Sequence, residues 1–136
     1  MFMQNRYERK NRRKFSLKIH VVLVTKYRKR LLVNGIDDFI KRACMYLAEQ
    51  NGWNVLAMET DKDHIHILLE YDTTERICDI IRILKQRTTH WLWVRYHDFL
   101  SKHYWKQHIF WSDGYFACSI GEVSSATIQK YIESQG

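Results

Sequence analysis

The segment over residues 63–69 constrains this chain more than any other, because aliphatic residues alternate in it with two histidines. Successive side chains of a β-strand point to opposite faces. A strand here turns three aliphatic side chains towards a core and turns His64 and His66 to the other face. Imidazole is the commonest metal ligand among side chains, so the pair forms half of a site for one cation. A further ligand has to come from elsewhere, and the alternative is two histidines that only make hydrogen bonds.

The length and composition predict a single globular domain over residues 1–136. The chain has 136 residues, of which 46% are hydrophobic and 14% aromatic, enough to fill one core. No long apolar run is present, and we expect a cytoplasmic protein. Cys44, Cys78 and Cys118 are widely spaced in apolar surroundings, which predicts reduced thiols in the core.

The charge balance favours a polyanionic partner. Twenty-two Lys and Arg stand against 15 Asp and Glu, giving a net charge of +7, and five Trp and eight Tyr are interleaved with the basic residues. Residues 1–14 are predicted to be a mobile basic arm that neutralises phosphates, or else a solvated tail. A second basic cluster could hold a phosphate backbone while its tyrosine stacks on a base, or could be a solvated turn. This cluster consists of Lys26, Tyr27, Arg28, Lys29 and Arg30.

Hydrophobic periodicity and turn residues predict four strands and three helices. Residues 88–112 are rich in aromatic side chains and indicate a mixture of core and DNA-facing surface. The order of elements predicts an α+β, ferredoxin-like (RRM-like) β-α-β-β-α-β antiparallel sheet with an additional C-terminal helix. In order, the elements are a strand over 15–25, a helix between Gly35 and Gly52, strands over 53–60 and 64–69 joined as a hairpin, a helix capped by Thr74, a strand over 114–121 and a helix capped by Ser124 or Ser125.

The last predicted helix places Tyr131 and Gln135 one turn apart on the same face. A tyrosine hydroxyl, with an ordinary pKa of about 10, is a weak nucleophile that needs a nearby cation or base. A metal bound by the histidine pair would supply that cation and would polarise a phosphate oxygen. The alternative is that both side chains belong to an ordinary amphipathic helix.

Taken together, these motifs make the sequence resemble the HUH single-tyrosine transposases of small insertion sequences, which move DNA as a single strand. The resemblance covers about residues 15–135. The motifs that carry it are Ile-His-Val-Val at 19–22, Thr-Lys-Tyr-Arg at 25–28, Asp-His-Ile-His-Ile-Leu-Leu at 63–69, Leu-Lys at 84–85, Phe-Trp-Ser-Asp-Gly-Tyr-Phe at 110–116, Ser-Ile-Gly at 119–121 and Ile-Gln-Lys-Tyr-Ile-Glu-Ser-Gln at 128–135.

The resemblance implies a site and a reaction. His64, His66 and Gln135 are expected to bind Mg²⁺ or Mn²⁺, although two imidazoles by themselves also suit zinc, iron or nickel. Tyr131 is expected to attack a DNA phosphate and form a 5′-phosphotyrosine, and Lys85 is a further expected DNA contact.

The same resemblance implies the substrate and the assembly. The expected substrate is single-stranded DNA with hairpins at the ends of an insertion sequence. The expected assembly is a homodimer whose active sites take their histidines from one subunit and Tyr131 from the other. The alternatives are a related HUH nuclease, such as a replication initiator or relaxase, and a domesticated protein that binds single-stranded nucleic acid without transposing it.

Overall fold

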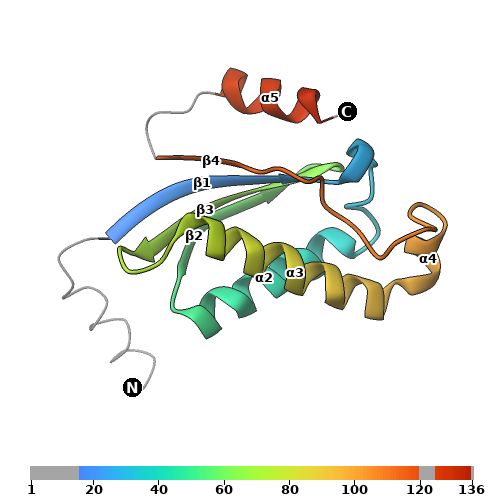
Figure 1. Ribbon diagram of the computed structural model, residues 1–136, viewed down its shortest axis with the longest axis horizontal. Coiled ribbons are helices and arrows are strands. Elements are labelled where there is room, and N and C mark those ends of the chain that lie inside the picture. Colours follow the sequence, from blue (N-terminus) through green and yellow to red (C-terminus); the bar gives the residue numbers. More distant parts are fainter. Residues whose placement is uncertain (1–15, 120–124, 136) are drawn as a thin grey trace.

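The computed structural model describes residues 16–119 and 125–135, which form one sheet with helices on both faces (Figure 1). The four strands are antiparallel and lie in the order β2-β3-β1-β4. The predicted basic arm over residues 1–14 lies outside the described residues. The elements are β1 (Ser16–Val24), the 3₁₀ turn η1 (Lys26–Arg28), α2 (Ile36–Asn51), β2 (Asn54–Thr60), β3 (His64–Asp72), α3 (Ile77–Arg95), α4 (His97–Ser101), β4 (Phe116–Ser119) and α5 (Ser125–Ser134).

This strand order confirms the predicted ferredoxin-like arrangement. β1 pairs with β3 on one side and with β4 on the other, so strands that are distant in sequence become neighbours. β2 and β3 form the predicted antiparallel hairpin, with a register shift between Val55 and Ala57. The helix between the glycines is confirmed too. Gly35 and Gly52 flank it with φ angles of 96° and 75°, a left-handed conformation that residues with a β-carbon seldom adopt.

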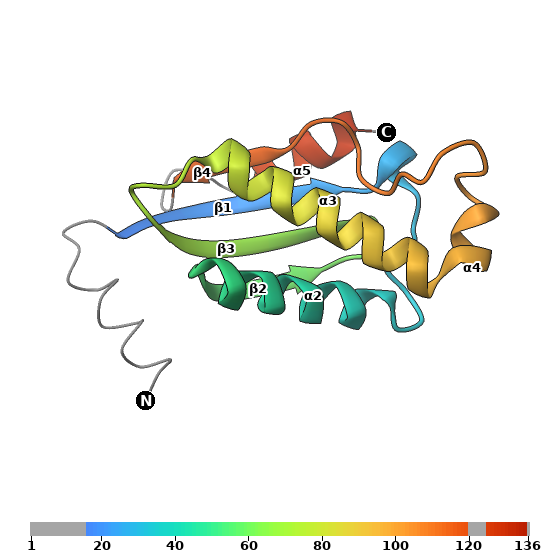
Figure 2. The same ribbon diagram turned by 60° about the horizontal axis from the view of Figure 1, so that its bottom comes forward.

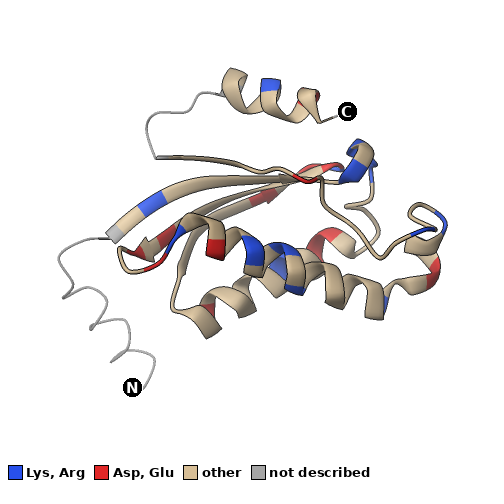
Figure 3. Cartoon of the chain, in the orientation of Figure 1, with Lys and Arg blue, Asp and Glu red and all other residues tan. Residues whose placement is uncertain are grey.

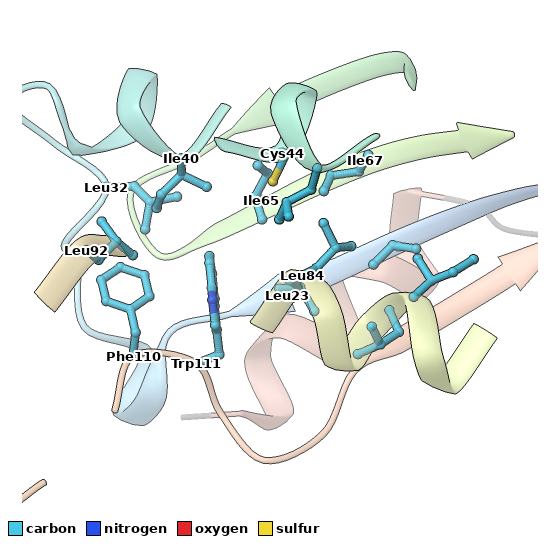
Figure 4. Close-up of a cluster of buried hydrophobic side chains, with 14 of the residues drawn as sticks. Leu23, Leu32, Ile40, Cys44, Ile65, Ile67, Leu84, Leu92, Phe110 and Trp111 are labelled. Atoms are coloured by element: carbon cyan, nitrogen blue, oxygen red, sulfur yellow. The ribbon is translucent and has the colours of Figure 1, made fainter. Parts of the chain in front are cut away.

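The main hydrophobic core lies between the sheet and the helices α2 and α3, which cover the same face of it (Figures 1 and 2). Ile65, Ile67 and Leu69 of β3 are buried there, as the alternation in the sequence predicts. Figure 4 shows Ile65 and Ile67 with Leu23 of β1, Ile40 and Cys44 of α2, and Leu84 and Leu92 of α3. The odd-numbered residues of the β3 motif therefore fix the sheet, and its histidines face the other way.

The opposite face of the sheet is covered by α5 (Figure 1). Val22 and Val24 of β1 are fully buried in a second cluster with Ile132 of α5, and Phe116 of β4 packs against it. β1 is therefore buried on both faces, which explains its unbroken apolar run over residues 21–24.

Two predicted boundaries are wrong, the start of α3 and the start of β4. Thr74 does not cap α3, which begins after Arg76 without a side-chain cap. Asp72 instead accepts a hydrogen bond from the Thr74 backbone N–H at 3.3 Å, which holds Thr74 in the preceding turn. α3 also continues to Arg95, through a region whose aromatic residues obscured its helical period. β4 begins only at Phe116, because the carbonyls of residues 112–114 bond to a lysine of α3 and not to a strand.

The aromatic stretch over residues 88–112 does extend the core, in line with that part of the prediction. Trp93, Phe110 and Trp111 are buried (Figure 4 shows the last two), whereas Trp105 is 75% exposed. No helix in the described part of the chain is long and apolar enough to cross a membrane.

The described cysteines are free, but they do not all lie in the core. Cys44 is buried, and burial raises its pKa to about 12. The prediction of a core position is wrong for Cys78. Its side chain is exposed in the first turn of α3, at the edge of the helix face that carries Ile80 and Ile81.

Candidate functional site

His64 and His66 lie side by side on the face of β3 that is opposite to the main core. Both are only partly exposed. Across the sheet, His64 is in register with Val24 and His66 with Val22, both on β1. On the other side, Glu59 of β2 is in register with His66. The histidines thus lie on the central strand of β2, β3 and β1, beside Val22 and Val24, which α5 covers.

A third histidine joins the pair. His20 of β1 lies with its Nδ1 2.7 Å from the Nε2 of His66, and their ring centroids are 4.9 Å apart. Which of the two nitrogens donates depends on the tautomers. Burial, followed by the charge interaction with His20, lowers the pKa of His66. A lowered pKa favours the neutral imidazole, which is the form that binds a metal.

Asp63 orients the other histidine of the pair. Its Oδ1 lies 2.8 Å from Nδ1 of His64, an arrangement that places the proton on Nδ1 and leaves Nε2 free as a ligand. The second carboxylate oxygen of Asp63 lies 3.4 Å from Nε of Arg28. Arg28 also donates a hydrogen bond from Nη1 to the Glu133 carbonyl at 3.3 Å. Arg28 therefore connects the histidine strand with the last turn of α5.

The donor set fits a divalent cation in part. His64 has an oriented imidazole with a free nitrogen, and the Nε2 of His66 lies against the His20 ring. Within residues 16–119 and 125–135, however, no three His, Cys, Asp or Glu side chains are arranged to hold one metal ion. A side chain of another type has to complete the site. Gln135 lies on the turn that follows Glu133, and its amide nitrogen donates to Ser134 Oγ at 3.0 Å.

Tyr131 lies on the same face of the sheet, over β1 and β4. Its ring packs against Phe116 with centroids 5.5 Å apart, and a Cβ at position 114 would lie 3.6 Å from its hydroxyl. The hydroxyl oxygens of Tyr131 and Ser112 are both buried, and neither forms a hydrogen bond of good geometry in the described structure. Burial raises the pKa of Tyr131, and the nearby Ser112 hydroxyl opposes that shift. The two hydroxyls therefore make a close polar contact without a well-formed hydrogen bond.

In this single chain, Tyr131 and the histidine pair are separated by β1. The Ser112 N–H donates to the Val24 carbonyl at 2.7 Å, and Val24 is in register with His64 on its other side. Two strand spacings, about 10 Å, therefore separate the backbone at Ser112 from that at His64. No hydrogen bond or ring contact joins Tyr131 to either histidine among the described residues.

The loop beneath Tyr131 is held by Lys85 of α3. The Lys85 ammonium lies 2.8, 3.0 and 2.7 Å from the carbonyl oxygens of Ser112, Asp113 and Gly114. Burial lowers the pKa of Lys85, and the carboxylate of Asp113 opposes the shift. Three donors facing three acceptors require the protonated amine, because a neutral amine has only two N–H groups. Lys85 thus fixes the segment that the Tyr131 hydroxyl touches.

Comparison with known proteins identifies the family of this chain. Residues 13–135 match the family model described as "Transposase IS200 like". The chain belongs to the IS200-like transposase family. This transposase is 34% identical to the ISDra2 transposase TnpA of Deinococcus radiodurans over 121 residues, covering 89% of this chain and 85% of that protein. It is also 27% identical over 122 residues to the transposase of insertion sequence element IS200 from Salmonella typhimurium, covering 90% of this chain and 78% of the relative.

Solved structures agree with the family assignment. The crystal structure of a protein assigned as a transposase from Deinococcus radiodurans R1 superposes with a TM-score of 0.81 at 30% identity, covering 89% of this chain and 92% of that one. A REP-associated tyrosine transposase bound to a REP hairpin shares the fold, with a TM-score of 0.55 at 10% identity over 86% of this chain and 62% of that chain. The first match extends the family relationship to three dimensions, and the second concerns the fold alone.

The structure places the residues predicted from the sequence in three groups. His64 and His66 lie together, Tyr131 and Gln135 lie on α5, and the basic cluster of residues 26–30 forms η1 and the residues after it. Lys26 of this transposase lies 3.3 Å from Asp113, whereas Tyr27 is 64% exposed. The predicted contact of Lys85 with DNA stays a prediction, and in this structure its ammonium is occupied by the loop.

Sequence reasoning missed three residues of this transposase that contact the site. His20 carried a signal, because it alternates with the apolar residues of β1 and must face the same side as the β3 histidines. Asp63 stands in the recognised motif at 63–69, and its position next to His64 allows the ring contact, but no role was predicted for it. Ser112 stands in a recognised motif, but nothing in the sequence indicates that its hydroxyl meets Tyr131.

We expect Lys85→Met to lower the free energy of unfolding of this transposase by about 1–3 kcal/mol, because it leaves three carbonyls without their charged donor. Chemical denaturation measures the change. Lys62→Met is the matched control, since Lys62 is exposed and no side-chain bond is seen for it. Equal stability of the two variants would show that the lysine does not hold the loop.

Proposed function

We propose that this transposase cleaves and rejoins single-stranded DNA at the ends of an insertion sequence, with Tyr131 as the nucleophile. The observation that supports this proposal is the position of two elements on one face of the sheet. β3 presents His64 and His66 there, and α5 carries Tyr131 over the same face. In a chain of a transposase family, these are the groups that phosphoryl transfer by a tyrosine requires.

The proposed step exchanges one ester bond for another. The Tyr131 oxygen forms a bond to a backbone phosphorus, and the bond from that phosphorus to the 3′ oxygen breaks. The tyrosine loses its proton and the departing 3′ oxygen gains one, so that a 5′-phosphotyrosine and a free 3′-hydroxyl result. Attack by a 3′-hydroxyl on the phosphotyrosine reverses the step and joins the strands.

The hydroxyl needs help to ionise, since burial raises the pKa of Tyr131 in the described position. We propose that His64, His66 and Gln135 hold Mg²⁺ or Mn²⁺. When bound, such a cation polarises a phosphate oxygen and stabilises the charge of the transition state. The contact of Asp63 with Nδ1 of His64 supports the proposal, because it fixes the orientation of the His64 ring.

The DNA partner is proposed to be a single strand that carries hairpins. The basic residues of η1 and those that follow it lie at the same end of the sheet as His64 (Figure 3), where they can neutralise phosphates. The REP-associated tyrosine transposase that shares the fold is bound to a REP hairpin, which supports a hairpin as the kind of structure recognised here.

We further propose a homodimer in which Tyr131 acts on DNA bound at the histidines of the partner. In the single chain, the hydroxyl lies beside Ser112 and Gly114 and not beside the histidines. A placement of α5 that brings Tyr131 closer to a pair of histidines would favour attack on a phosphate bound there. Exchange of α5 between two subunits is one way to obtain it.

We expect Tyr131→Phe to abolish the covalent protein–DNA adduct while binding of the oligonucleotide persists. The phenyl ring keeps the contact with Phe116, and only the nucleophile is lost. Incubation with single-stranded oligonucleotides from the flanks of the gene, with Mg²⁺ or Mn²⁺, followed by denaturing electrophoresis, measures the adduct. Tyr115→Phe is the matched control and retains it. An adduct formed by Tyr131→Phe would exclude the proposed nucleophile, and binding without any adduct in the wild type would favour a non-transposing nucleic-acid-binding protein.

We expect His64→Ala to abolish binding of Mn²⁺, and Asp63→Asn to weaken it by about 10- to 100-fold, the usual effect of losing the group that orients a ligand. Isothermal titration in the absence of DNA measures both affinities. His90→Ala, an exposed histidine on α3, serves as the control. If His64→Ala bound Mn²⁺ as tightly as the control, the metal site would have to lie elsewhere.

We expect a mixture of Tyr131→Phe subunits and His64→Ala subunits to regain adduct formation, although each variant alone is inactive. After complete exchange about half of the dimers are mixed, and each of these has one intact site out of two. About a quarter of the wild-type sites are then active. If exchange is demonstrated by mass spectrometry and no adduct appears, the sites are assembled within one subunit.

A further inference from the structure

A small hollow lies between η1 and the segment that follows α4, at the end of the sheet near His64. Its volume is about 270 Å³, and its lining includes Tyr27, Tyr104, Trp105 and Lys106. We propose that this hollow binds one unpaired nucleobase of the single-stranded DNA, flanked by its two phosphates. The inference rests on the proposed function and deepens it, because it gives the strand a fixed point beside the active site.

Two large aromatic rings are left in solvent at the hollow. Tyr27 is 64% exposed and Trp105 75%, the latter being the most exposed large hydrophobic side chain among the described residues. The other aromatics of the segment, Tyr104 and Phe110, are buried. Exposed rings beside basic residues are the surface on which proteins stack the bases of single strands, because every base offers a flat face.

Each exposed ring has an ammonium group over it. Lys26 Nζ lies 5.4 Å from the centroid of Tyr27, and Lys106 Nζ lies 4.9 Å from that of Trp105. Burial lowers the pKa of His103 at the same hollow, and the positive charges of Lys29 and Lys102 lower it further. Stacking faces and cations therefore alternate over a short distance. An unpaired nucleotide has the complementary pattern, a flat base between two negative phosphates.

The backbone holds Tyr27 in place at a cost in strain. Tyr27 has φ 63° and ψ 15°, and Arg28 has φ 56°, the left-handed region that residues with a β-carbon seldom adopt. Three hydrogen bonds fix this turn. The Thr25 hydroxyl donates to the Lys29 carbonyl at 2.6 Å, the Lys26 N–H donates to the Phe110 carbonyl at 2.8 Å, and the Tyr104 hydroxyl donates to the Lys26 carbonyl at 2.7 Å. The ring is therefore positioned in advance, so that binding does not have to order it.

The hollow is connected to the candidate active site through one short junction. The Thr25 N–H donates to the Asp63 carbonyl at 3.0 Å, and Arg28 contacts the carboxylate of the same Asp63. Figure 3 places the basic residues of η1 and of the segment after α4 at this end. The volume of the hollow lies just below the range of ordinary small-molecule pockets. A single base therefore fits the hollow better than a folded hairpin loop does.

The test couples a change in the protein to a change in the DNA. All chains carry Tyr131→Phe, so that cleavage does not obscure binding. Fluorescence anisotropy measures the affinity of one labelled single strand and of copies in which an abasic site is placed at each position in turn. Trp105→Ala should weaken binding of the intact strand by about 5- to 150-fold, the effect of removing one stack. Tyr46→Ala, a half-exposed aromatic of α2 that does not line the hollow, is the control and should not weaken it.

The abasic scan identifies the seated base. At one position, loss of the base should weaken binding to the protein with native Trp105 about as much as Trp105→Ala weakens binding of the intact strand. In the Trp105→Ala protein, loss of the same base should cause no further weakening. Tyr27→Ala should show the same coupling at the same position, and thermal melting confirms that each variant is folded. Unchanged affinity of both variants would overturn the proposal. The proposal would also be overturned if the two variants weakened binding of the intact strand and of every abasic strand equally. The two side chains would then contribute to binding without contacting a base.

The outcome for this hollow is separate from that for catalysis. Coupling to an abasic position without any adduct in the chain with native Tyr131 would keep the base site and remove the proposed reaction. An adduct without coupling would keep the reaction and remove the base site.

Discussion

The burial of β1 on both of its faces is the constraint on which this structure depends. Its odd-numbered side chains pack against α2 and α3, and Val22 and Val24 pack against α5. β1 also supplies hydrogen-bond partners to β3 and β4. A strand so enclosed tolerates neither a shift in register nor a polar side chain in its last four residues. The histidine strand and the tyrosine helix, which are far apart in the sequence, are consequently placed relative to the same four residues.

Arg28 and Lys85 show how the chain uses cations inside its own structure. Arg28 joins Asp63 to the last turn of α5, and Lys85 gathers the carbonyls of the loop before β4. Both residues stand in stretches that a reader of the sequence assigns to DNA. A basic protein that binds a polyanion can thus owe part of its charge to internal contacts. The charge balance alone does not distinguish the two uses.

The sequence predicted the sheet because its signals were local. Alternation marked the histidine strand, and paired glycines marked the ends of α2. Contacts between distant segments gave no such signal. His20 stands in the Ile-His-Val-Val motif, but the register that brings it to His66 joins residues 46 positions apart in the sequence. Thr74 looked like a cap because the competing bond from Asp72 cannot be seen in a linear pattern. The histidine pair followed from strand alternation, whereas the roles of Tyr131 and Gln135 followed from the resemblance, since both residues also satisfy an ordinary amphipathic helix.

The packing of α5 differs from that of the other long helices. Among its described side chains only Ile132 is buried, and the hydroxyl of Tyr131 is enclosed without a formed hydrogen bond. Little apolar area and one unsatisfied polar atom make its attachment weak compared with that of α2 and α3. The amide protons of α5 should therefore exchange with solvent by release of the helix as a unit, while those of β1 and β3 exchange only when the whole domain unfolds. The transposase thus carries Tyr131, the proposed nucleophile, on a helix that costs less free energy to detach than α2 or α3.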